Sequence, residues 1–497
     1  MLRHRSGMQT DFVFLRRISV RLLAFKENTM KIVLIVIVAY LLVMLGIGLL
    51  FSKKTSSAED YYLSGRSLPT FVLVFTFAAT WIGASATLGK SGLAYSAGYS
   101  AIYPTLGSFV AFFVFSLFAG KIRRVGANNS ISSIPELFLR RFGKSTSLIA
   151  SVVIAWTLIC TTGTQLIAFS KVLKYIFSPY GISYEQAVIA GMLVIILYTV
   201  LSGMYGVAYT DVMQGLILMT VIGLIVPAGA MQMAGGWTAL HEELPQSYFT
   251  FAPSISMIGY TVTSLLYFVS GPPYWQRAFA AKDEKAAVRG AFGGNLLIIY
   301  YTIAVVFIGI CAAVVFPGVG ADEAEMVLLM MVEARFHPLV YAITVAAIVA
   351  VIMSTTDSYL ILSAQTVALD IFGMASGSKD EKSIIRASRI SVIITGALAL
   401  VFALSMQNIF QAMMLSMTQY AAAVAIPALA ALFSKKVTRQ GMNSAMISGL
   451  AFSLIWSKLL HSPGGISESI AGSLVSLLVI IVVSALTQSK EPAPYFD

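Results

Sequence analysis

Charged residues are scarce in this chain of 497 residues: Asp, Glu, Lys and Arg make up 11%, whereas hydrophobic residues make up 58%. Soluble domains carry about 25% charged residues, so this composition excludes an ordinary soluble domain and a disordered chain. Cysteine and histidine are also scarce, with two and four residues. Cys160 and Cys311 lie in apolar runs and the histidines form no HExxH pattern, which excludes a disulfide framework and argues against a zinc enzyme.

Long apolar runs dominate the sequence instead. Runs of about 18 or more mostly apolar residues are typical of membrane-spanning helices. Thirteen such runs lie near residues 32–51, 69–97, 100–120, 145–177, 185–202, 211–234, 255–280, 289–316, 337–371, 386–406, 409–433, 441–461 and 468–488. We therefore predict an all-α polytopic membrane protein with about 13 transmembrane helices. Its membrane domain, 32–488, lies between a basic extension, 1–31, and a short cytoplasmic tail, 489–497.

The distribution of Lys and Arg between the loops predicts the orientation in the bilayer. If the first loop, with Lys53, Lys54 and Arg66, is cytoplasmic and the sides alternate, 21 basic residues lie in cytoplasmic loops and 4 in outer loops. This pattern predicts a multi-pass protein of the plasma (inner) membrane with its N-terminus outside and its C-terminus in the cytoplasm. The net charge of +11 then reflects topology and does not indicate a nucleic-acid partner.

The basic segment 1–31 conflicts with this orientation, because its many arginines should resist translocation. One explanation is an incorrectly assigned start, with Met30 as the first residue. The other is an amphipathic basic segment that lies on a membrane surface. A cleavable secretory signal is excluded, since a suitable apolar region with a small-residue cleavage site is absent.

Two of the apolar runs are interrupted by residues that break helices. The second run has Gly83 within a stretch of small and polar residues, and the seventh run contains Gly271-Pro272-Pro273. Proline removes a backbone donor and ends or kinks a helix, although a simple packing kink is the alternative at both places. Broken helices at matching positions of two halves are typical of inverted repeats with a central site.

The ninth run contains five successive polar residues, from Ser354 to Ser358. Such a run is unfavourable in a membrane unless it faces a wet or coordinating interior. Hydroxyls and freed carbonyls suit a monovalent cation, whereas hydrogen bonding within or between helices is the alternative. Asp357 favours a functional site, because carboxylates within membrane spans usually have a function. Lys90, in the second run, either snorkels toward the outer interface or attracts a substrate carboxylate.

Four stretches of the sequence resemble motifs of one known family: residues 59–69, 203–214, 276–282, and 353–355 with Asp370. It is the sodium:solute symporter family, which includes sodium-coupled sugar, proline, pantothenate, sialic acid and choline transporters. Residues 59–69 look like the family's loop before its first core helix, and residues 203–214 look like its signature. Residues 276–282 resemble its Gln-Arg motif, and Met353-Ser354-Thr355 with Asp370 fit its sodium-binding helix. The resemblance covers nearly the whole chain.

The resemblance implies a LeuT-type core of five plus five inverted helices, here 69–234 and 255–433, that alternates access under a sodium gradient. It implies a sodium site that combines backbone carbonyls with two hydroxyls, at Ala79, Ile82, Val351, Ser354 and Thr355. An inner-gate aromatic pair is implied at Tyr267 and Phe268, with Phe in place of the more usual Trp. A cytoplasmic-mouth aspartate is implied at Asp211, where a helix N-cap is a compatible alternative.

The substrate is less determined than the ion. Residues 79–83 and 354–358 most resemble the choline-transporter branch, and an aromatic face beside Asp357 could hold a quaternary ammonium. Thr164 and Gly271 stand where further cage rings are expected, however, so choline is not favoured. Trp81 replaces the polar residue of proline- and sugar-type members, which argues against a plain sugar or proline carrier. We expect a small polar organic solute that carries a carboxylate or an amine, such as an amino acid.

The candidate substrate-binding residues are polar or aromatic residues near the breaks and in the fourth span: Trp81, Ser85, Gln165, Tyr267, Phe268 and Pro272. Gln165 either bonds the substrate or bridges helices. The candidate coupling or gating residues are Asp211, Asp357 and Lys90.

These residues predict a sodium-coupled symporter without an organic cofactor, working as a monomer or weak oligomer in the lipid bilayer. A proton-coupled carrier of the same fold is an alternative. A transporter-like membrane sensor is another, although no signalling domain follows the last span. A channel or a membrane enzyme lacks support, because the sequence has no filter motif, nucleophile elbow or metal cluster.

Overall fold

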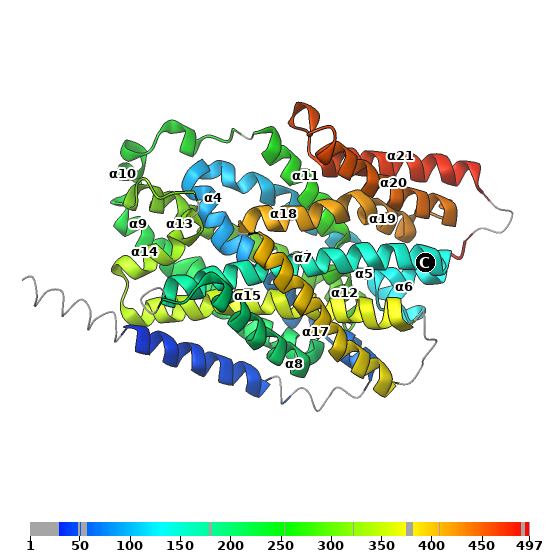
Figure 1. Cartoon of the computed structure of the whole chain (residues 1–497), viewed down its shortest axis with the longest axis horizontal. Helices are drawn as coiled ribbons and strands as arrows, with labels where there is room; N and C mark the ends of the chain where they lie inside the picture. Colours follow the sequence, from blue (N-terminus) through cyan, green and yellow to red (C-terminus); the bar gives the residue numbers. More distant parts are fainter. Residues whose placement is uncertain are drawn as a thin grey trace, which may run out of the picture.

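The computed structural model describes residues 29–47, 50, 57–177, 181–252, 254–321, 323–373, 381–406, 408–488 and 493–496. The described chain is a bundle of helices, most of which run along its long axis (Figure 1). Its extended backbone pairing is limited, within these residues, to an isolated bridge between Leu68 and Ala281. The all-α prediction is therefore confirmed. Residues 1–28, and with them most of the basic extension, lie outside the described part.

The first half of the chain begins with a helix at Thr29–Ile47. It continues with α2 (Ala58–Leu63), η1 (Ser64–Arg66), α3 (Thr70–Trp81), η2 (Ser85–Gly89), α4 (Lys90–Ala97), η3 (Gly98–Ile102), α5 (Tyr103–Asn128), α6 (Ile134–Phe142), α7 (Lys144–Phe177), α8 (Tyr184–Thr220), η5 (Val221–Ile225), α9 (Val226–Met233), α10 (Gly236–Glu243) and η6 (Gln246–Phe249).

The second half has the same helical character. It consists of α11 (Ile255–Ser270), α12 (Pro272–Ala280), α13 (Glu284–Val315), η7 (Ala324–Met326), α14 (Val327–Arg335), α15 (Pro338–Gln365), η8 (Thr366–Gly373), α17 (Glu381–Ser405), α18 (Ile409–Tyr420), η9 (Ala421–Ala425), α19 (Ile426–Phe433), α20 (Arg439–Lys458), η10 (Pro463–Gly465) and α21 (Glu468–Leu486).

Nine helices of the described residues are long and apolar enough to cross a membrane, fewer than the thirteen runs counted in the sequence. The difference has physical reasons, because the other four runs are helical too. Runs 69–97 and 255–280 are broken, into α3 and α4 and into α11 and α12. Run 185–202 is part of the longer α8, and run 441–461 forms α20, which carries more polar side chains.

The long α8 covers the predicted fifth span, the signature stretch and the first part of the sixth span, which continues in η5 and α9. Contacts near Tyr205 and at the two flanks lie at different ends of the bundle. The Tyr205 hydroxyl lies 3.1 Å from that of Ser67, just before α3 begins. At the opposite ends, the Tyr184 hydroxyl donates to the carbonyl of Ala403 at 3.2 Å, and Gly229 lies against the ring of Phe336. These are the contacts that two crossings would make, so the division into spans five and six stays a prediction.

The two ends of the bundle carry different segments. Helices α10 and α14 lie at one end, and α6 lies at the other (Figure 1). We call these the α10 end and the α6 end. The described tail residues return to the α6 end, where the Tyr495 hydroxyl accepts a hydrogen bond from Lys121 at 2.7 Å. Which end faces the cytoplasm stays a prediction, as do the exact bounds of the repeats.

Candidate functional site

The break after α3 frees backbone carbonyls in the middle of the bundle. Ile82 has φ −75° and ψ 86°, and the Gly83 N–H donates to the Trp81 carbonyl at 2.9 Å, which is an inverse γ-turn. In a continued helix this N–H would bond to the Ala79 carbonyl, four residues earlier. The turn therefore leaves the Ala79 oxygen without its helical donor, at the place where the sequence predicted the break.

Gln165 of α7 stabilises this break. Its Oε1 accepts a hydrogen bond from the Ala84 N–H at 2.9 Å, and its side chain is buried. The Ala84 N–H would otherwise have bonded to the Thr80 carbonyl, so Gln165 replaces a lost helical bond. Of the two roles considered for Gln165, the structure shows the bridge between helices.

Thr355 on α15 faces the freed carbonyls. Its hydroxyl lies 3.2 Å from the Ala79 oxygen and 3.2 Å from the Ile82 oxygen. A Cβ added at Gly83 would lie 3.0 Å from the same hydroxyl, so glycine permits this close approach. Three of the five predicted sodium ligands thus meet: Thr355 contacts Ala79 and Ile82, from which it is 276 and 273 residues away in sequence.

The other two predicted ligands lie on the adjacent turn of α15. Ser354 donates to the carbonyl of Val351 at 3.0 Å, and both side chains are buried. The Ser358 hydroxyl donates to the Ser354 carbonyl at 3.0 Å. Asp357, also buried, lies within electrostatic range of Tyr40. The whole polar run of α15 therefore faces the protein interior.

On the α6 side of the break after α3, a buried charged network joins four helices. Arg277 of α12 donates to Ser358 Oγ at 2.7 Å and to Thr76 Oγ1 of α3 at 3.0 Å. Thr76 donates to Asp211 Oδ2 of α8 at 2.5 Å, and that oxygen lies 3.8 Å from the guanidinium. Both charged side chains are fully buried. Asp211 therefore connects helices and does not cap one, because it lies within α8.

The second break separates α11 from α12 at Gly271. Pro272 and Pro273 occupy the first positions of α12, where a missing N–H is tolerated. The carbonyl of Ser270, which has lost its helical donor, accepts a hydrogen bond from the Tyr420 hydroxyl at 2.6 Å. Pro272 is buried in this packing and is absent from the residues that line the cavity described next.

A small cavity of about 40 Å³ lies beside the first break. Four predicted site residues line it: Trp81, Ser85, Lys90 and Phe268. The rings of Trp81 and Phe268 are 6.1 Å apart. Tyr267 points elsewhere, since its hydroxyl lies 3.2 Å from that of Tyr359 on α15. The predicted aromatic pair is thus divided between the cavity and the core.

Lys90 does not snorkel to the surface. Its side chain is 4% exposed, and its ammonium donates to the Ala101 carbonyl at 3.3 Å and to the Thr105 hydroxyl. Of the two alternatives for this lysine, the interior position is the one observed.

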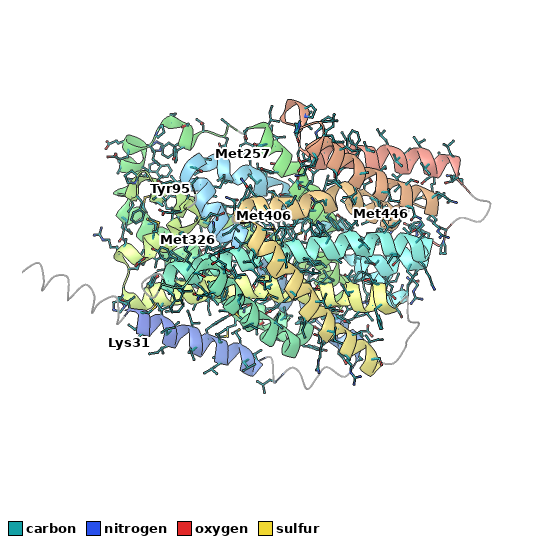
Figure 2. All side chains as sticks on the ribbon, viewed as in Figure 1. Lys31, Tyr95, Met257, Met326, Met406 and Met446 are labelled. Carbon is teal, nitrogen blue, oxygen red and sulfur yellow. The ribbon has the colours of Figure 1, made fainter. Side chains whose placement is uncertain are left out.

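A larger cavity of about 490 Å³ lies at the α10 end. Tyr95 of α4 and Met257 of α11, both labelled in Figure 2, line it. Phe410 of α18 lines both cavities and packs edge-on against Tyr260, with ring centroids 5.3 Å apart. A third cavity, of about 540 Å³, lies between α2, α6 and η8 and shares no lining residue with the other two.

The sequence did not point to α18 as a cavity wall. Phe410, Met413, Met414 and Met417 line the small cavity from this helix. Apolar side chains that face a cavity and apolar side chains that face lipid give the same hydropathy signal, so only the fold distinguishes them.

Comparison with known proteins identifies the family. The profile of the sodium:solute symporter family matches residues 61–449. The osmoregulated proline transporter OpuE of Bacillus subtilis (strain 168) is 28% identical over 474 residues, which cover 92% of this chain and 95% of that protein. A sodium/proline symporter of Staphylococcus aureus is 26% identical over 491 residues, 93% of this chain and 94% of that protein. The choline-branch likeness of two short stretches is thus minor beside these full-length matches.

Solved structures show the same fold. A Na⁺-coupled sialic acid symporter in a substrate-bound, outward-open state superposes with a TM-score of 0.77 at 19% identity, covering 94% of this chain and 99% of that one. The nucleobase-cation symporter Mhp1 in a closed conformation gives a TM-score of 0.57 at 14% identity, with 86% and 96% coverage. The LeuT-type architecture is therefore confirmed. Because the family profile covers most of the chain, this protein is a membrane transporter and not an enzyme, and it belongs to the sodium:solute symporter family.

Proposed function

We propose that this protein couples the movement of a small polar organic solute to sodium by alternating access. The ion would bind at Ala79, Ile82, Val351, Ser354 and Thr355, where every donor is a neutral oxygen. The observation that carries the proposal is the Thr355 hydroxyl, 3.2 Å from each of two carbonyls at the helix break. Irregular backbone at membrane depth is tolerated where it lines a site, and in transporters unwound carbonyls coordinate the coupling ion.

The donor set fits an ion that must be released after each cycle. A site without a carboxylate ligand binds a monovalent cation moderately, because ion–dipole attraction alone opposes dehydration. On binding, the Thr355 hydroxyl would turn its proton away from the two carbonyls and present a lone pair to the ion. Gln165 would keep the break open in both states.

The Arg277–Asp211 network supports a second role, as an inner gate. It ties both broken helices to α8 and α15 on the α6 side of the sodium site, so a solute leaving in that direction would have to separate them. Because both charged groups are fully buried, each needs the other as its partner, and the pair is stable only while the helices stay together. Asp357, on the same buried face, would contribute negative potential for the cation.

The solute class is proposed from the cavity and from the relatives. The relatives are named as proline transporters. The small cavity beside the first break suits a solute of few atoms, such as a small amino acid, carboxylate or amine. A sodium-coupled carrier is favoured over a proton-coupled one because the candidate ion ligands are hydroxyls and carbonyls, which do not titrate near neutral pH.

The sodium site can be tested on the purified protein without knowing the solute. A ligand that binds only the folded state raises the melting temperature by mass action. We expect NaCl to raise it more than KCl at the same ionic strength. Thr355→Ala should weaken this sodium effect about tenfold or more in apparent Kd, since it removes a hydroxyl ligand to a charge.

Thr356→Ala is the matched control, because the Thr356 hydroxyl bonds the Ile352 carbonyl of its own helix. It should keep the full sodium effect. An unchanged sodium response in Thr355→Ala would reject this site. An equal response of the wild-type protein to NaCl and KCl would reject sodium as the ion and favour the proton-coupled alternative.

A further inference from the structure

Lys90 has no acidic partner among the described residues. Its ammonium donates only to the neutral oxygens of Ala101 and Thr105, and none of the ion pairs among the described residues includes it. Lys171 offers a contrast: its ammonium is 2.5 Å from the carboxylate of Glu325. Burial without a counter-charge disfavours the charged form of a lysine, so an anion bound beside Lys90 would stabilise that form.

The cavity beside Lys90 has room for a small solute. Its volume of about 40 Å³ would hold about three water molecules, which is close to the size of a short carboxylate. Its walls are mostly apolar, formed by the rings of Trp81 and Phe268 and by three methionines of α18. None of the described lining residues is an aspartate or a glutamate.

The larger cavity at the α10 end adjoins this small cavity at Phe410. Phe410 lines both the small cavity and the larger one of about 490 Å³, so this ring and its edge-on contact with Tyr260 separate the two. A solute entering from the larger cavity would therefore meet the Phe410 ring before it reached Lys90.

We propose that Lys90 is the counter-charge for a carboxylate of the transported solute, and that the solute's apolar part rests between Trp81, Phe268 and the α18 methionines. The proposal rests on the proposed symport function and narrows its solute class. An ammonium group placed in the same cavity would meet a positive charge instead of a partner. Amines that lack a carboxylate, choline among them, are therefore excluded as substrates.

Two classes of solute carry the carboxylate that Lys90 would bind, and both can be tested. A simple monocarboxylate is represented by propionate and a zwitterion by proline. Propionamide and prolinamide are their controls of nearly equal shape, in which an amide replaces the carboxylate. The full-length protein in detergent, in NaCl, is titrated with each compound, and its melting temperature is followed.

We expect propionate, proline or both to raise the melting temperature, and neither amide to do so. Lys90→Met should weaken the carboxylate effect by about tenfold to a hundredfold in apparent Kd, because a charge-assisted hydrogen bond is lost. Lys458→Met, at an exposed position on α20, is the control and should bind as the wild type does.

The outcomes separate the two proposals. If NaCl still stabilises Lys90→Met whereas carboxylates no longer do, both proposals stand. Stabilisation by an amide or by choline as strong as that by a carboxylate would overturn the role of Lys90 while leaving the sodium site intact. So would an unchanged carboxylate affinity in Lys90→Met, or no response to either carboxylate. If Lys90→Met fails to fold, the comparison of carboxylate with amide on the wild-type protein decides.

Discussion

The buried pair Arg277–Asp211 should be worth much more than a shorter pair on the surface. Its charged atoms are 3.8 Å apart, and both side chains are fully buried. At an effective dielectric constant of 20, Coulomb's law gives about 4 kcal/mol for this separation. Removing either partner alone leaves the other buried without compensation, which typically costs about 3–5 kcal/mol. Removing both should cost far less than the sum.

A double-mutant cycle with Asp211→Asn and Arg277→Met measures this coupling. The unfolding free energy in detergent is obtained for the wild type, each single variant and the double variant. We expect a coupling of about 3–4 kcal/mol, somewhat below the Coulomb value, because Arg277 keeps its hydrogen bonds to Ser358 and Thr76 in the Asp211 variant.

The surface pair Arg124–Glu284 is the control. Its atoms are only 2.7 Å apart, but its side chains are 50% and 44% exposed. Exposed pairs typically contribute about 0.2–1 kcal/mol, because water and salt screen the attraction. A coupling for the buried pair that does not exceed that of the surface pair would refute the reasoning, and with it the inner-gate role.

Three further predictions follow from single contacts. Gly83→Ala should destabilise the protein by about 1–3 kcal/mol and reduce the sodium response, because its Cβ would press on Thr355 at 3.0 Å; an unchanged NaCl-dependent melting shift contradicts this. Asp357→Asn should raise the NaCl concentration for half-maximal stabilisation severalfold; an unchanged concentration would make the residue structural. Tyr495→Ala should lower the unfolding free energy by about 1 kcal/mol, because its hydroxyl and ring hold Lys121; equal stability would show that the tail contact is weak.

The sequence predicted the places where the fold departs from regular helices, because glycine and proline act locally. Gly83 and Gly271-Pro272-Pro273 both interrupt helices in the structure. It predicted less well which runs qualify as separate spans, since a broken helix loses the length by which a span is recognised. The contacts near Tyr205 fall in the gap between the apolar runs 185–202 and 211–234, which hydropathy had separated.

What could not be predicted are contacts between distant residues. Gln165 at the break, Arg277 between Thr76 and Ser358, and Lys90 beside Ala101 depend on how helices pack, and no local pattern encodes that. The burial of polar residues was predictable in general, because polar groups in a membrane span need an interior partner. Which residues are their partners could be determined only from the structure.

The positions of Lys90 and of the sodium site predict how strongly ion and solute are coupled. Lys90 follows Ile82 by eight residues across the break and η2, which places it on the order of 12 Å from the sodium site. At an effective dielectric constant of 20, two unit positive charges at this distance repel each other by about 1.4 kcal/mol, a factor of about ten in affinity. A carboxylate that neutralises Lys90 removes this repulsion, so sodium should bind about tenfold more tightly when the solute is present.

Linkage requires the same factor in the opposite direction, from sodium to solute. Titrations of sodium at zero and saturating propionate, and of propionate in NaCl and in KCl, measure the two factors independently. In Lys90→Met, sodium alone should bind about tenfold more tightly than in the wild type, and propionate should no longer change its affinity. If the coupling persists in that variant, it arises from a conformational change shared by both sites, and electrostatic relief through Lys90 is not its cause.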